Sequence, residues 1–367
     1  MDKALSNRLP ICLQPDHTAY LSDAFRLCII QADHRNTSWL YSRYIQLYAL
    51  DLQTLAQPSY IDFADSLNCS DVLDTSTVSR EEAQKIASIV QFSKDAVGDG
   101  SYIVLFTDDA HLRGQQEPFV HELLIYGHDD LTHEVLCVGL GNSEKGLKRF
   151  GPLRFGYDQF ESAFHRALEQ ISPGCPFEPI ARPIQIIKPK KTSSGFDALR
   201  LATEIRNYLE CSPVNVMRER QRYWWWLTPS PDEYPSGLPV SSGRDVYDDL
   251  LEHLDEVGHR LQRPDYRQFH VLWEHKVGIC KRIEHLRSIE HGFEALADTL
   301  VRCQSRATEF QSLRMRVLLS RRGTLDAESV KFGLSVLRRA RSDEFDDLMP
   351  IADRLACRAR LIEPGMS

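Results

Sequence analysis

One predicted β-hairpin constrains the fold of this chain more than any other feature of the sequence. Residues 119–130 contain an apolar run, 123–126, followed by Gly127 and two aspartates, and residues 135–138 resume the apolar pattern. Glycine and aspartate are typical of turns, so we expect the chain to reverse between the two runs. Residues 102–106 are rich in the β-branched and aromatic side chains that suit a pleated sheet, and they predict a third strand.

Composition is that of an ordinary globular protein. The chain has 367 residues with 42% hydrophobic and 26% charged residues, and its net charge of -8 argues against nucleic-acid binding. No apolar run approaches the roughly 18 residues of a membrane helix, and the first residues lack the apolar core of a signal peptide, so we expect a cytoplasmic protein that does not enter the membrane. The nine cysteines are scattered without a Cys-x-x-Cys pair, which favours neither a disulfide framework nor a zinc site. We expect no metal and no cofactor.

The two halves of the chain have different patterns. In the first half, helical spacing predicts helices over residues 22–30 and 157–171, and Ser79 with Glu82 forms a predicted capping box that opens a helix reaching Val90. Residues 39–48 are dense in aromatic side chains and are expected to be buried. The second half is helical, with segments predicted at 194–210, 244–261, 264–289, 292–319, 326–340 and 345–361.

A run of prolines separates these halves. Prolines recur from 173 to 189, and proline at this density breaks helices and favours extended chain. We therefore predict an α+β domain with an antiparallel sheet in residues 1–175, a proline-rich linker in 176–192 and a helical bundle domain in 193–367.

His121 is the main candidate for a catalytic residue. It stands where the first hairpin strand begins, and a neutral imidazole can act as a general base near pH 7. Cys12 is the candidate nucleophile, whereas Cys28 lies among apolar residues of a predicted helix and resembles core. Asn142, on the returning strand, is the candidate that orients the imidazole. The alternatives are a structural histidine and a turn asparagine, and the aspartates of the hairpin turn are expected to lie more than about 20 Å from His121.

Two further groups are candidates for binding. Trp224 and Trp225, near several arginines, are expected to contact an apolar substrate together with Tyr126 of the hairpin. The alternative for the tryptophans is a packing anchor, which we favour. His270 and Glu274 have a spacing that can bind a metal, but a salt-bridged helix face is the better interpretation, and Lys276 is expected to pair across helices or approach a cleft.

Parts of the sequence resemble a known family. Residues 100–106 and 121–130 look like the N-terminal domain of butirosin biosynthesis protein H and its relatives, a group similar to papain-like, bacteriocin-processing cysteine peptidases. Residues 39–48, 245–247 and 269–276 resemble proteins encoded beside bacterial nonribosomal peptide and polyketide synthases. The resemblance implies a papain-like first domain and transfer of an acyl group from a carrier-protein thioester to an amine. His121 matches the family's base, but its cysteine has no clear match and its aspartate is replaced by the region 139–142.

Two functions follow as hypotheses. The first is an acyl or peptidyl transferase, or a cysteine-peptidase-like enzyme with an incomplete triad, in natural-product and antibiotic biosynthesis. In this first hypothesis, His121 deprotonates an amine, and the amine then attacks the carrier-protein thioester. The second is a non-catalytic protein of papain-like fold that binds an acyl or peptidyl carrier protein or a synthetase module. An acidic carrier would prefer a basic patch, for which the candidates are Arg314, Arg316, Arg321 and Arg322. The oligomeric state is left open, a homodimer included.

Overall fold

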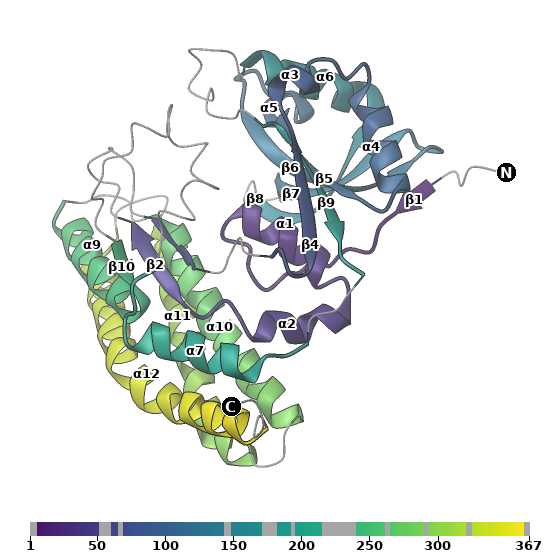
Figure 1. Cartoon of the computed structure of the whole chain (residues 1–367). Coiled ribbons are helices and arrows are strands. Elements are labelled where there is room, and N and C mark those ends of the chain that lie inside the picture. The colour runs from purple at the N-terminus through teal and green to yellow at the C-terminus, as the bar shows by residue number, and fades with distance from the viewer. Residues whose placement is uncertain are drawn as a thin grey trace. The chain divides into compact units, whose positions relative to one another are not determined.

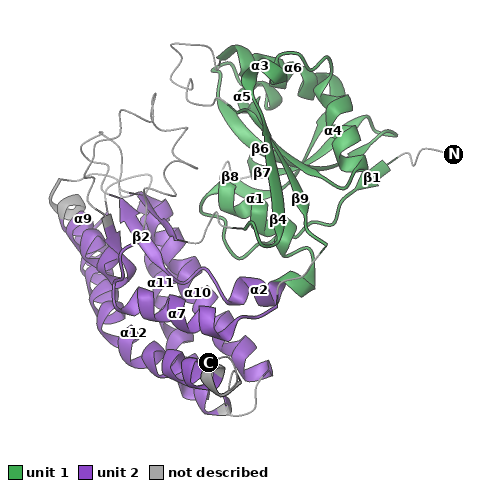
Figure 2. Cartoon of the chain, in the orientation of Figure 1, with its two compact units in different colours: residues 1–36, 69–193, 217–235 green, residues 37–68, 194–216, 236–367 purple. Residues whose placement is uncertain are grey.

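A computed structural model describes residues 6–50, 60–64, 69–142, 148–170, 182–191, 195–214, 240–260, 265–289, 293–320 and 325–362. The chain divides into two compact units (Figure 2). Unit 1 comprises residues 1–36, 69–193 and 217–235, and unit 2 comprises residues 37–68, 194–216 and 236–367. This division differs from the expected order, because residues 37–68 belong with the helical part. The expected linker 176–192 also contains a strand of the unit 1 sheet.

Unit 1 is built on an antiparallel sheet. The described strands run in the order β4-β9-β5-β6-β7-β8, and β1 pairs with β6. The strands are β1 (Ser6–Arg8), β4 (Leu73–Val78), β5 (Tyr102–Asp108), β6 (Val120–Asp129), β7 (Glu134–Asn142), β8 (Lys148–Gly156) and β9 (Ile184–Pro189). The proline-rich segment thus places β9 beside β5 in the middle of the sheet, where Ile184 and Ile187 are buried.

The predicted hairpin is confirmed, but Gly127 is not its turn. Strands β6 and β7 pair antiparallel with Leu124 opposite Val138, and the chain reverses after β6. Gly127 lies inside β6, at an irregularity in the ladder and opposite Arg8 of β1. A Cβ atom at Gly127 would stand 2.7 Å from the backbone oxygen of Asn7, so the glycine permits close approach of β1.

Helices cover both faces of the unit 1 sheet (Figure 1). They are α1 (Leu21–Ile30), α3 (Arg80–Ala83), α4 (Ile89–Gly98), α5 (Asp109–Leu112) and α6 (Tyr157–Gln170). The face that carries Leu105, Leu123 and Ile125 forms one core with residues of α4 and α6. The opposite face meets α1, where the rings of Phe25 and Phe150 lie 6.3 Å apart.

The capping box of Ser79 and Glu82 is confirmed, yet the helix it opens is shorter than expected. Both reciprocal hydrogen bonds are present, but α3 ends at Ala83. A second helix, α4, then begins with its own cap, because the side chain of Ser88 accepts a hydrogen bond from the Gln91 N–H. The predicted single helix is therefore two helices, each with its own N-terminal cap.

Unit 2 is mainly helical. Its elements are α2 (Thr37–Tyr41), α7 (Ala198–Leu209), α9 (Val246–Arg260), α10 (Tyr266–Ile289), α11 (Ala297–Leu319) and α12 (Ala327–Ile362), with a small sheet of β2 (Leu47–Leu50), β3 (Tyr60–Phe63) and β10 (Val240–Ser242). The two helices predicted at 326–340 and 345–361 are one helix, with Pro350 inside α12. An interior proline removes a backbone hydrogen bond. The burial of Leu348 and Ile351 on either side shows that packing holds the helix together there.

The expected α+β class, with an antiparallel sheet followed by helices, is confirmed at that level. The papain-like fold stays a prediction. Within the described ranges, no helix is both long enough and apolar enough to span a membrane.

Candidate functional site

His121 lies near the start of β6, where its backbone pairs with Thr107 of β5. Alternation along the strand puts it on the same face as Leu123, toward the core that includes α4 and α6. Its side chain is 23% exposed, and Nδ1 is 3.9 Å from Oε2 of Glu122. The ring centroid is 5.3 Å from that of Phe119. The imidazole is therefore partly open to solvent, with a carboxylate and an aromatic ring beside it.

The backbone that carries His121 is held by the buried carboxylate of Asp108. Asp108 caps α5 through the His111 N–H and also accepts from the Phe119 N–H at 3.3 Å. Arg166 and Gln170 of α6 donate to its other oxygen at 3.0 and 2.9 Å. Burial works against ionisation, but these hydrogen bonds outweigh it and hold the pKa of Asp108 below its ordinary value. Two positions before His121, the chain is thus anchored to both α5 and α6.

Cys12 lies on the other side of the sheet from His121. Its backbone N–H donates to the carbonyl of Cys28 in α1, at 2.9 Å. Helix α1 covers the face opposite to the one that carries Leu123, and therefore opposite to His121. Among the described residues, no hydrogen bond or ion pair joins Cys12 to His121. The structure does not bring the predicted nucleophile and base together.

Two buried cysteines of unit 1, Cys28 and Cys137, are poor nucleophiles. Burial, with a smaller contribution from the nearby Cys12, raises the pKa of the Cys28 thiol, and burial alone raises that of Cys137. Both side chains are fully buried. Because the thiolate is the reactive form, these residues are core, as expected for Cys28.

The other predicted site residues are placed as follows. Asn142 is the last residue of β7, opposite Lys148 of β8, and its role stays a prediction. Tyr126 is in β6, where its backbone oxygen accepts from the Leu9 N–H at 2.8 Å. The Tyr126 side chain is half-buried, and this burial raises the pKa of its hydroxyl. Its role in substrate binding stays a prediction. Trp224 and Trp225 lie outside the described residues.

The charged residues at the start of α10 pair with protein groups. Nε2 of His270 is 2.8 Å from Oε1 of Glu274, so the two side chains contact each other one helical turn apart, as expected for paired side chains on one helix face. Nε2 of His275 is 2.9 Å from the carbonyl oxygen of Ile45. No cluster of three or more His, Cys, Asp or Glu side chains within the described ranges is placed to hold a metal ion.

A buried network of charged groups and hydroxyls in unit 2 joins α7, α9, α10 and α12. The ammonium of Lys276 is 2.6 Å from Oε1 of Glu344, which confirms that Lys276 pairs across helices. The hydroxyl of Tyr208 donates to Oε2 of Glu344 at 2.5 Å, and that of Tyr247 donates to the same oxygen at 3.0 Å. All four side chains are buried. Sequence reasoning did not find Glu344 or the tyrosines, because their partners lie far away in the chain.

The network is structural in character. Burial lowers the pKa of Lys276 to about 8, although Glu344 works in the opposite direction. Burial also raises the pKa values of Tyr208 and Tyr247, and the Glu344 carboxylate adds to both effects. The side chains of Lys276 and Glu344 are 2% and 0% exposed, so no substrate could reach them without a rearrangement.

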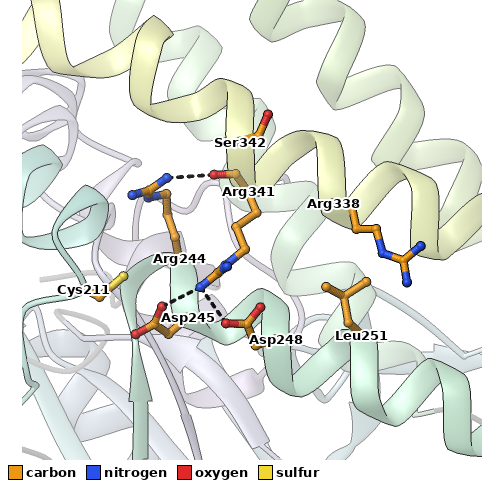
Figure 3. Close-up of a pocket in the computed structure, with 8 residues that line it drawn as sticks. All are labelled: Cys211, Arg244, Asp245, Asp248, Leu251, Arg338, Arg341 and Ser342. Atoms are coloured by element: carbon orange, nitrogen blue, oxygen red, sulfur yellow. Dashed lines mark hydrogen bonds and ion pairs between the residues drawn. The ribbon is translucent and has the colours of Figure 1, made fainter.

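A pocket opens beside this network, at the surface of unit 2 (Figure 3). Its volume is about 330 Å³. Three segments contribute to it: the turn after α7, the start of α9 with the turn before it, and the middle of α12. The lining residues are Cys211, Arg244, Asp245, Asp248, Leu251, Arg338, Arg341 and Ser342. The pocket therefore combines cations, carboxylates, one thiol and one apolar side chain. Sequence reasoning did not predict it.

Comparison with known proteins adds no relative to this description. No protein-family model matches the chain, and no curated protein matches it either.

Proposed function

We propose that this protein is a non-catalytic accessory factor that binds a carrier protein or a synthetase module. One observation carries the proposal: Cys12 packs beside α1, on the opposite face of the sheet from His121. Catalysis by a thiol requires the nucleophile within about 3 Å of its base. A sheet between the two side chains prevents that contact, so the protein has no working Cys–His pair at these positions.

The partner class rests on the resemblance to proteins encoded beside nonribosomal peptide and polyketide synthases. Two of the four predicted basic residues are described, and both lie on α11. The guanidinium of Arg314 is 4.4 Å from the ring centroid of Trp273, and that of Arg316 is 4.8 Å from the ring centroid of Phe332. Stacking on an aromatic ring fixes a guanidinium while preserving its charge. Such fixed cations suit an acidic partner. Arg321 and Arg322 lie outside the described residues.

Binding and catalysis can be tested side by side. Carrier proteins encoded by the flanking genes would be loaded with their acyl groups, labelled and titrated with the full chain, with fluorescence anisotropy as the readout. We expect saturable binding that weakens with salt and with Arg316→Gln, whereas Arg339→Gln, on α12, is the matched control. We also expect the same product from carrier thioester and amine with and without the protein. Turnover that is lost in Cys12→Ala would refute the proposal.

His121 favours a second candidate, a transferase without a covalent enzyme intermediate. A thioester is already activated, so a base that deprotonates the amine is sufficient for attack. The carboxylate of Glu122, 3.9 Å from Nδ1 of His121, would stabilise the imidazolium that forms. Turnover that survives Cys12→Ala, falls by about 10²-fold or more in His121→Gln and is unchanged in His165→Gln would favour this candidate. Equal turnover in the two histidine variants would exclude it.

A further inference from the structure

The pocket of unit 2 has an internal ion pair that fixes its floor. Nη2 of Arg341 is 3.1 Å from Oδ1 of Asp245 and 2.6 Å from Oδ2 of Asp248. The two carboxylates are 48% and 50% exposed, so both remain in contact with solvent. Figure 3 shows this group at the centre of the pocket. One guanidinium thus faces two carboxylates that remain open to solvent.

Arg244 braces the pocket and is already engaged with the protein. Its Nε donates to the Leu209 carbonyl at 2.9 Å, and its Nη1 donates to the Arg341 carbonyl at 2.7 Å. Its guanidinium also lies 5.2 Å from the ring centroid of Phe345. These contacts join α7, α9 and α12 around the pocket. Because these contacts occupy the guanidinium of Arg244, Arg338 is better placed than Arg244 to bind a ligand.

Arg338 differs from its neighbours on α12. Its side chain is exposed, and within the described residues no carboxylate pairs with it. The next residue, Arg339, is paired with Glu309 at 2.9 Å. In Figure 3 the Arg338 side chain lies opposite Leu251, at the side of the pocket away from Cys211. The pocket therefore holds a cation that no described carboxylate pairs with, beside an apolar side chain and two exposed carboxylates.

We propose that this pocket binds a small zwitterion of the amino-acid class, with its carboxylate on Arg338, its ammonium on Asp248 and its apolar side chain on Leu251. A ligand with one sign of charge meets an attractive group and a repulsive group in the same pocket. A zwitterion can place its carboxylate against the arginine and its ammonium against the aspartate, so that both contacts are attractive. A volume of about 330 Å³ is at the lower end of the range for small-molecule sites, which suits a ligand of this size.

The proposed binding is reversible. Cys211 lines the pocket, but its thiol does not react with the ligand. Burial raises the pKa of the Cys211 thiol, and its hydrogen bond with Asp245 adds to the effect. A protonated thiol is a weak nucleophile. The proposal is independent of carrier binding, because its residues lie on α9 and α12 and its ligand is a free small molecule.

Calorimetric titration of the full chain with three matched probes tests this proposal. L-Leucine carries both charges, 4-methylpentanoate lacks the ammonium group and 3-methylbutylamine lacks the carboxylate. We expect L-leucine to bind, and each analogue to bind at least about tenfold more weakly, because a hydrogen bond to a charged group contributes that much affinity. No binding of L-leucine, or equal binding of leucine and either analogue, would overturn the proposal. Inorganic phosphate binding as tightly as L-leucine would show a simple anion site instead.

Variants of Arg338 and Asp248 test which residue binds each charged group of the ligand. Arg338→Gln should weaken L-leucine binding at least about tenfold while leaving the weak binding of 3-methylbutylamine unchanged. Asp248→Asn should weaken leucine and the amine together. Arg339→Gln, at an exposed side chain one position along α12, is the matched control and should bind L-leucine like the wild type. Thermal unfolding of each variant verifies the fold. Wild-type affinity in a folded Arg338→Gln protein would refute the assignment.

Discussion

The buried ion pair of unit 2 gives the sharpest stability prediction. Lys276→Met removes the ammonium while keeping a side chain of similar length, and it leaves the Glu344 carboxylate without its cation. At 2.6 Å and an effective dielectric constant of about 20, the lost attraction is about 6 kcal/mol. The hydroxyls of Tyr208 and Tyr247 still donate to the carboxylate and offset part of that loss. We expect a decrease of about 3 kcal/mol in the free energy of unfolding, at the low end of the range for a broken buried pair.

Urea denaturation followed by circular dichroism measures this change, and a double variant tests its cause. Lys276→Met/Glu344→Gln removes both charges but keeps an amide oxygen as an acceptor for the tyrosines. It should be at least about 1 kcal/mol more stable than Lys276→Met alone, because no buried charge is left uncompensated. Arg339→Gln, which breaks an exposed pair with Glu309, should cost less than about 1 kcal/mol. If Lys276→Met costs no more than this control, or the two single changes simply add, the reasoning is wrong.

Two further predictions follow from the same region. Burial lowers the folded pKa of Lys276 from its usual 10.5 to about 8, so between pH 8 and 10 the unfolded chain binds more protons and the free energy of unfolding should rise with pH. Above pH 10 the trend should reverse, since Tyr208 and Tyr247 have raised folded pKa values and ionise only on unfolding. Denaturant titrations across this range should show no rise in Lys276→Met. Gly243 has a φ of +59°, and a Cβ there would stand 2.2 Å from the Tyr208 carbonyl oxygen. Gly243→Ala should therefore lower the free energy of unfolding by more than about 1 kcal/mol in the same assay, and an unchanged midpoint would contradict this.

The candidate site illustrates what a sequence can and cannot place. His121 was found because a histidine at the start of an apolar run is a local signal, and β6 carries it as expected. Its distance from Cys12 was not predictable, because the side of the sheet on which a segment packs depends on contacts between distant parts of the chain. The pocket was missed for the same reason. Its residues come from three separated segments, and none of them is unusual in its own neighbourhood.

Local periodicity and capping by themselves determined the α+β class, the strands of the hairpin and most of the helices, because these depend on neighbours within a few residues. The tertiary structure decided the rest. It joined residues 37–68 to the helical unit, made Gly127 a point of close approach for β1 and kept α12 continuous through Pro350. It also brought Lys276 to Glu344. In each case the deciding interaction lies between segments remote in sequence, where the burial of apolar surface and charge outweighs local preference.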